Sequence, residues 1–159
     1  SPYLGFGSLK DTLSGSAERG KGVFVLAATS IPEGASVQRA TIGGTTLANS
    51  IWESLAEINA VTASGNARFG SFGAVLGATL NLQSFGLGQV MAGQPNAATP
   101  ILAPGFGAQG AELSASKQLF GEAASQVIHS VSRSVLQAGE AGLAKAIDGA
   151  KAELAIGLG

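Results

Sequence analysis

The chain has 159 residues, of which 45% are hydrophobic and 12% charged, and nine basic against ten acidic residues give a formal net charge of −1. This length suits a single domain over residues 1–159, and the near-neutral charge argues against nucleic acid as a partner. The lack of cysteine, the single histidine and the absence of a long apolar run predict a cytoplasmic protein with no metal site, no cofactor and no membrane span.

Short apolar runs alternate with helical segments along the chain. A helix is expected over 8–18, followed by a near-continuous apolar strand over Val23–Ala28 and weaker strands over 74–78, 101–103 and 127–131. Two helical stripes are expected to face the core: Ile51, Trp52, Leu55, Ile58 and Val61, and then Leu143, Ala146, Ile147, Ala150 and Leu154. The alternation predicts a parallel sheet with crossover helices. Residues 36–50 are broken by Gly43 and Gly44, and residues 82–99 are expected to form a loose helix and a loop.

Residues 101–110 (ILAPGFGAQG) have the character of a phosphate-binding turn. A strand ends at Pro104, and Gly105, Gly107 and Gly110 allow the backbone to turn tightly and present N–H groups to an anion. Gln109 adds a neutral donor. The next strand end carries Ser132 and Arg133, and a guanidinium can bind two phosphate oxygens at once. Two consecutive strand ends are therefore expected to converge on one anion.

The same three glycines match G-x-G-x-x-G, the fingerprint of dinucleotide-binding proteins. That fold places an Asp or Glu about 20 residues further on, where this chain has Ser130, Ser132 and Arg133. Because an arginine there suits a 2′-phosphate, an NADP-dependent α/β oxidoreductase is an alternative. A non-catalytic phosphate-binding module is another.

The predicted units are too few for a closed (β/α)8 barrel, which takes roughly 250 residues. The first residues, 1–9 (SPYLGFGSL), are typical of a loop that follows a strand. We therefore expect the chain to be the C-terminal part of a longer polypeptide.

Four segments resemble the orotidine 5′-phosphate decarboxylases, in particular their actinobacterial branch. Residues 1–5 (SPYLG) are similar to the loop after the fourth barrel strand, and residues 23–30 (VFVLAATS) with Pro32 to the fifth strand and its loop. Residues 103–110 (APGFGAQG) are similar to the seventh strand end, and 131–133 (VSR) to the eighth. The resemblance implies an α/β fold that is the C-terminal part of a (β/α)8 TIM barrel, roughly strands 5–8 with their helices.

The resemblance also implies an activity: decarboxylation of orotidine 5′-monophosphate to UMP in pyrimidine biosynthesis, without a cofactor. In the family, the serine at the position of Ser30 contacts the pyrimidine and the proline at Pro104 lines the pocket. The residues matching Gln109 and Arg133 hold the phosphate. Ser132 replaces a glycine of other branches. A homodimer of the complete protein is implied as well.

The family's catalytic array comes from an Asp-x-Lys-x-x-Asp motif and a further lysine, and no such motif occurs in this chain. We therefore assign no catalytic residue here and expect a missing N-terminal barrel segment to supply the array. His129 falls inside a strand and is expected to be a hydrogen-bonded core imidazole. Asp148 and Glu153 are expected to be solvated charges on the last helix.

Overall fold

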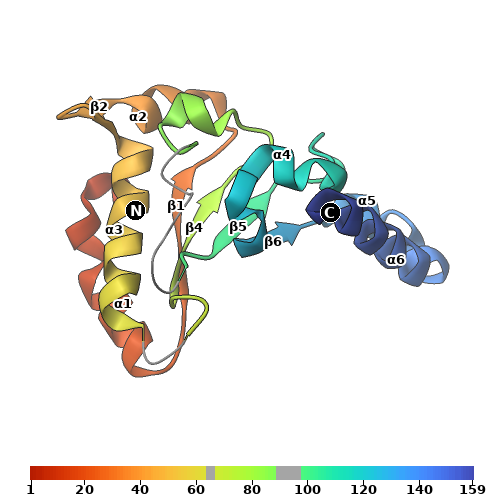
Figure 1. Ribbon diagram of the computed structural model, residues 1–159, viewed down its shortest axis with the longest axis horizontal. Helices are drawn as coiled ribbons and strands as arrows, with labels where there is room; N and C mark the ends of the chain where they lie inside the picture. The colour runs from red at the N-terminus through yellow and green to blue at the C-terminus, as the bar shows by residue number, and fades with distance from the viewer. Residues whose placement is uncertain (64–66, 89–97) are drawn as a thin grey trace.

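The computed structural model describes residues 1–63, 67–88 and 98–159 (Figure 1). Its strands are β1 (Val23–Ala28), β2 (Thr41–Ile42), β3 (Thr45–Thr46), β4 (Phe72–Leu76), β5 (Ile101–Pro104) and β6 (Val127–Ser130). Its α-helices are α1 (Lys10–Glu18), α2 (Ala35–Arg39), α3 (Leu47–Thr62), α4 (Ser116–Phe120), α5 (Arg133–Leu136) and α6 (Gly139–Leu158). Short 3₁₀ turns are η1 (Pro2–Leu4), η2 (Phe6–Leu9), η3 (Pro32–Gly34), η4 (Leu82–Phe85), η5 (Leu113–Ala115) and η6 (Gly121–Gln126).

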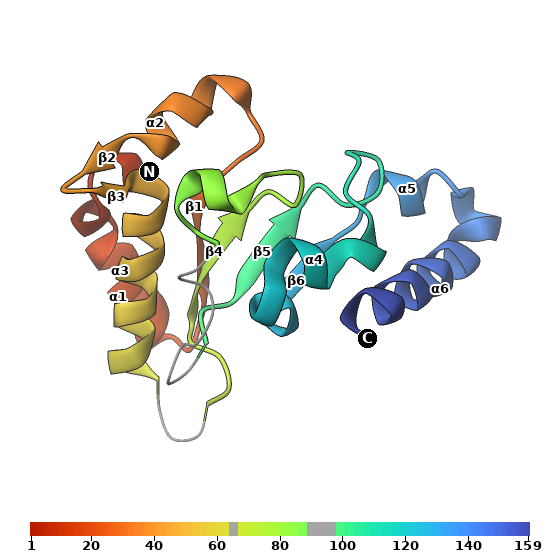
Figure 2. The ribbon, with the colours of Figure 1, turned by 45° about the horizontal axis from the view of Figure 1, so that its top comes forward.

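Four strands form one sheet in the order β1-β4-β5-β6, and every pairing in it is parallel. The strands therefore lie side by side in chain order, and all their carboxyl ends meet at one edge (Figure 2). This arrangement confirms the parallel sheet predicted from the alternation of strands and helices. It is the order of a singly wound barrel wall, in which each crossover returns to the neighbouring position.

The helices cover one face of this sheet. Val25, Ala74 and Ile101 occupy one row of in-register partners, and all three are buried beneath the helices. Ala103, further along the sheet, is also buried. Because side chains alternate along a strand, the neighbouring residues face the other way. The hydrophobic core therefore lies between the helices and only one side of the sheet.

The opposite face carries a second row of apolar side chains, which we call the inner row: Phe24, Leu26, Val75, Leu102 and Ile128. Leu26 pairs with Val75, Val75 with Leu102, and Leu102 with Ile128. Phe24, Leu26 and Ile128 are 40%, 39% and 50% exposed. No element in the described part of the chain covers these three side chains as the helices cover the core.

Helix α3 is joined to β4 by the buried amide of Asn59, a residue outside the apolar stripe expected from the sequence. Val61, expected on the core stripe, is 84% exposed, so that prediction is wrong. Asn59 is fully buried instead, and its Nδ2 donates to the Phe72 carbonyl (2.6 Å) while its Oδ1 accepts from the Phe72 N–H (3.0 Å). A search for apolar periodicity does not find Asn59, because this residue is polar. It can be buried because its amide is hydrogen-bonded.

The uncertain segment 36–50 contains a β-hairpin. Gly43 and Gly44, with φ of +61° and +91°, turn the chain between β2 and β3, and a two-residue turn of this kind needs positive φ at both positions. Helix α3 then begins at Leu47, capped by the Thr46 hydroxyl, which accepts from the Asn49 N–H (3.1 Å). In the other uncertain segment, η4 forms the short helix, and residues 89–97 lie outside the described residues. Among the helices described, none is long and apolar enough to cross a membrane.

Candidate functional site

The carboxyl ends of β1, β4 and β5 are tied together just beyond the sheet. The Gly77 N–H donates to the Ala28 carbonyl (3.0 Å), and the Ala78 N–H donates to the Pro104 carbonyl (2.8 Å). The backbone nitrogen of Ser30 lies beside Gly77, at van der Waals distance from where a Cβ would stand. The structure therefore brings Ser30 and Pro104 to the same edge of the sheet, as the sequence predicted.

The loop that carries Ser30 is held by a buried glutamine. Gln38 is 3% exposed, its Oε1 accepts from the Thr29 N–H (2.9 Å), and its Nε2 donates to the Thr29 hydroxyl (3.1 Å). The Tyr3 hydroxyl donates to the Ala27 carbonyl (3.1 Å), and burial raises the pKa of Tyr3. Sequence reasoning missed Gln38, because nothing local distinguishes a glutamine that binds a loop nine residues away.

The glycine-rich turn after β5 closes on itself. Gly105, Gly107 and Gly110 have φ of +121°, +70° and +106°, a region that favours glycine. The Gly107 N–H donates to the Ala111 carbonyl (2.8 Å), the Gly110 N–H to the Gly107 carbonyl (2.8 Å), and the Ala111 N–H to the Gly105 carbonyl (3.2 Å). Two glycine amides predicted to face an anion thus donate within the turn. The glycines supply its shape, and Gln109 is exposed at its tip.

Helix α5 is seated on this turn through a glycine. A Cβ on Gly107 would collide with the Ser134 hydroxyl and would touch Val131. Ser132 precedes α5 and Arg133 begins it, and both are exposed. The β6 loop therefore meets the β5 turn at Gly107, so the two segments predicted to share an anion are neighbours. Gln109 and Arg133 are thereby carried on adjoining segments.

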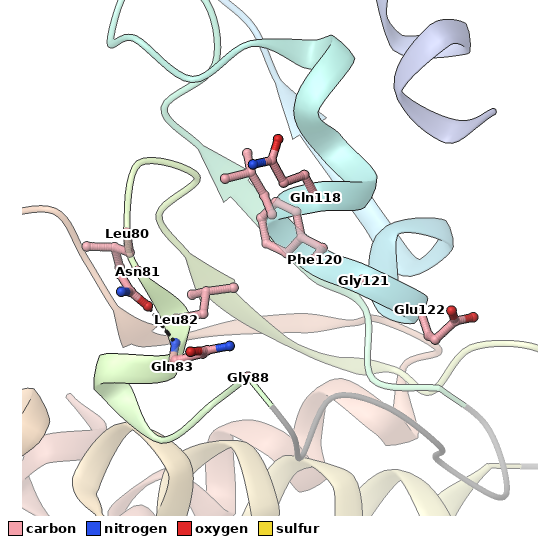
Figure 3. Close-up of a pocket in the computed structure, with 10 residues that line it drawn as sticks. Leu80, Asn81, Leu82, Gln83, Gly88, Gln118, Phe120, Gly121 and Glu122 are labelled. Atoms are coloured by element: carbon pink, nitrogen blue, oxygen red, sulfur yellow. Dashed lines mark hydrogen bonds between the residues drawn. The ribbon is translucent and has the colours of Figure 1, made fainter.

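Two cavities flank the first turn of α4. One, of about 440 Å³, is lined by Thr79, Gln109, Gly110 and Glu112 and by α4 residues that include Gln118. The other, of about 500 Å³, lies between η4 and the α4–η6 segment, with Gln118, Phe120 and Glu122 on one side and Leu80, Asn81 and Gln83 on the other (Figure 3). Of these two cavities, only the first includes predicted site residues, Gln109 and Gly110, and it borders the strand ends.

His129 lies on the helix-covered face of β6. Its Nε2 forms a hydrogen bond of 2.6 Å with the hydroxyl of fully buried Ser116, and its ring lies 5.0 Å from the Phe106 ring. Burial lowers the pKa of His129, which favours the neutral imidazole. The predicted hydrogen-bonded imidazole is present, and its partner Ser116 is a residue that sequence reasoning missed.

Glu153 is not the solvated charge expected from the sequence. Its Oε1 accepts from the Leu113 N–H (2.7 Å) and the Ser114 N–H (3.3 Å), at the start of η5. Glu112, at the N-cap of η5, makes no capping hydrogen bond with its side chain. The carboxylate is drawn out of solvent because it satisfies two N–H donors that a helix end leaves free. Asp148, in contrast, is exposed as expected.

The dinucleotide-binding alternative is not supported by the topology. A Rossmann sheet reverses its strand order at the binding crevice, whereas these four strands run in chain order. In that fold the third glycine opens a helix, but here η5 begins only at Leu113, after Gly110 and the closing residue Ala111. The glycines therefore form a closed turn and not the start of a phosphate-binding helix.

None of the lysines of the chain belongs to the residues that end or directly follow β1, β4, β5 or β6. Lys10 lies in α1, Lys21 just before the amino end of β1, Lys117 in α4, and Lys145 and Lys151 in α6. Within the described ranges, no three His, Asp or Glu side chains are grouped as metal ligands. The described site thus offers polar and cationic binding groups without a carboxylate–lysine array.

Comparison with known proteins identifies similar chains. No family model matches the sequence. The chain is 44% identical over 140 residues to the orotidine 5′-phosphate decarboxylase of Salinispora arenicola, and 46% identical over 141 residues to that of Streptomyces coelicolor. Each alignment covers 87% of this chain and 46% of the relative, so the chain spans about half the length of the curated relatives it matches.

Solved structures agree with this result. A Streptomyces avermitilis protein provisionally named orotidine 5′-phosphate decarboxylase superposes with a TM-score of 0.83 at 40% identity, over 99% of this chain and 53% of that one. The UMP synthase of Leishmania donovani gives 0.72 at 29% identity, over 98% and 32%. The resemblance to orotidine 5′-phosphate decarboxylases is confirmed, and the fold is part of a TIM barrel.

Proposed function

We propose that this chain supplies the pyrimidine- and phosphate-binding part of an orotidine 5′-phosphate decarboxylase site, which converts orotidine 5′-monophosphate to UMP. The meeting of the β5 turn with the start of α5 at Gly107 carries this proposal. It sets Gln109 and Arg133 on adjoining segments, as shared binding of one phosphate requires. The similarity to decarboxylases over 87% of the chain supports the same reading.

Each predicted residue has a role that its position can support. Ser30 binds the pyrimidine ring and Pro104 lines the pocket, since both lie at the joined ends of β1 and β5. Arg133 and Gln109 bind the phosphate, with the Ser132 backbone beside them. The glycines contribute by holding the turn in a conformation that few other residues adopt.

The chemistry of carbon–carbon cleavage comes from outside this chain in our proposal. The described strand ends carry no lysine, and the inner row leaves one face of the sheet without a cover. A remaining barrel segment that covers this row would bring charged catalytic groups to the same carboxyl edge. Phosphate binding at Arg133 would then position the reacting carbon, because binding energy remote from the reaction can be used for orientation.

The test uses the full-length protein that contains this chain. Titration with UMP should show saturable binding, NADPH should not compete with it, and orotidine 5′-monophosphate should lose its carboxylate as CO₂. Binding of NADPH with no binding of UMP would refute the proposal in favour of an oxidoreductase. Binding of inorganic phosphate without turnover would favour a non-catalytic module.

We also propose that the complete protein is a homodimer of the cytoplasm. Sedimentation of the full-length protein and fractionation of cells test these two statements. A monomer across the micromolar range, or recovery with membranes, would contradict them.

A further inference from the structure

The last helix, α6, grips the segment that follows the glycine-rich turn. Glu153 accepts from the Leu113 N–H at 2.7 Å and from the Ser114 N–H at 3.3 Å. These residues begin the helical stretch η5–α4, and their N–H groups need a partner from outside their own helix. A carboxylate near a helix N-terminus also interacts favourably with the helix dipole.

A second contact lies one turn further along the same helix. A Cβ on Gly157 would overlap the Leu113 carbonyl oxygen and the Ser114 backbone, so the α6 backbone packs directly on the two residues that Glu153 binds. Gly157 is buried although most of α6 is exposed. Two contacts four residues apart therefore fix the register of α6 on η5.

This attachment is only two residues from the glycine-rich turn. The Ala111 N–H donates to the Gly105 carbonyl and the Ala111 carbonyl accepts from the Gly107 N–H, so Ala111 closes the turn from both sides. Only Glu112 separates Ala111 from Leu113. The geometry that presents Gln109, two residues before Ala111, is thus anchored at its exit by the last helix of the chain.

We propose that Glu153 is a positioning residue for phosphate recognition, acting through Leu113 and the glycine-rich turn; this rests on the function proposed above. Loss of the carboxylate frees two N–H groups at the exit of the turn. The turn then samples more conformations. Phosphate binding has to order it, and this cost lowers the phosphate affinity. The effect falls on the phosphate group and not on the nucleoside.

The experiment compares three variants of the full-length protein. Glu153→Ala should weaken UMP binding about tenfold, which corresponds to about 1.4 kcal/mol. It should raise KM for orotidine 5′-monophosphate more than it lowers kcat, and should leave turnover of phosphate-free orotidine unchanged. Glu153→Gln keeps the accepting oxygen and should recover most of the affinity. Asp148→Ala, an exposed carboxylate on the same helix, is the matched control and should behave as the parent.

Amide hydrogen exchange gives a readout that needs no ligand. Exchange at 105–111, 113 and 114 should accelerate in Glu153→Ala and not in Asp148→Ala. Equal loss of activity on orotidine and its monophosphate, or lower stability with unchanged UMP affinity, would overturn the proposal. If the parent failed to bind UMP, the proposed function would fall, and unchanged exchange at 105–111 would overturn the positioning role separately.

Discussion

Replacing Gly107 by alanine tests whether α5 is seated on the glycine-rich turn. A Cβ at Gly107 would collide with the Ser134 hydroxyl, and its backbone has a φ of +70°. Gly110 provides a matched control because its φ is +106° while no atom lies within 4 Å of its Cβ position. Both variants strain the backbone, and only Gly107→Ala also pushes on α5, which Arg133 begins.

The two costs can be separated in magnitude. Alanine in the left-handed region costs about 1–2 kcal/mol, which both variants should lose in the free energy of unfolding. Overpacking adds about 1–3 kcal/mol for Gly107→Ala alone. If α5 relieves the collision by moving away, the free energy of phosphate binding should weaken by an amount similar to this overpacking cost. UMP affinity should then fall roughly 5- to 150-fold.

The assay is a double-mutant cycle on the full-length protein, with urea unfolding and UMP titration as readouts. Ser134→Gly removes the colliding side chain, so Gly107→Ala with Ser134→Gly should recover the overpacking component but not the backbone strain. Equal behaviour of Gly107→Ala and Gly110→Ala, with no coupling to Ser134, would refute the contact between the turn and α5.

Three further outcomes are expected. Arg133→Ala should lower kcat/KM for orotidine 5′-monophosphate by a factor equivalent to about 1.5–3 kcal/mol, as for hydrogen bonds to a charged group, and Gln109→Ala should cost less; equal damage to a phosphate-free substrate would show that Arg133 does not bind phosphate. Burial lowers the pKa of His129 below its ordinary 6.5, so the unfolded chain binds a proton first as the pH falls. Its contribution to stability should thus be complete above about pH 6.5 and decline below it; the parent minus His129→Gln difference in urea unfolding should shrink between pH 7.5 and 5.5, and a constant difference would contradict the reasoning. Residues 1–159 expressed alone should associate or bind a hydrophobic dye through the inner row, and addition of the remaining barrel segment should suppress this; a monodisperse monomer with cooperative unfolding would argue against it.

The sequence was informative wherever local chemistry sets the structure. The apolar run Val23–Ala28 is β1 residue for residue, and the glycine spacing after Pro104 marks a turn in which each glycine has positive φ. Gly43 and Gly44 likewise indicated the break that the structure resolves as a hairpin. These features depend on a few adjacent residues, so pattern and propensity are enough to find them.

The missed residues are polar groups whose partners are distant in sequence. Asn59, Gln38, Ser116 and Glu153 bind groups that lie 13, 9, 13 and 39 or 40 residues away. Each occupies a position where hydropathy predicts exposure, and each is drawn inward by a backbone or imidazole partner. Only the folded topology creates those partners, and this is why the apolar stripe included the exposed Val61 and left out the buried Asn59.

The strand order has a consequence for assembly. In the described sheet, β1 pairs only with β4, and β6 only with β5, so one side of each outer strand offers free backbone donors and acceptors. A segment that closes the barrel has to pair with both outer strands, β1 and β6, which lie at opposite sides of the same sheet. We call these two pairings the seams. Joining one seam holds the second pair of edges close together, which raises their effective concentration and makes closure cooperative. A separate segment that completes the sheet should therefore bind with both seams formed or with neither, as a 1:1 complex.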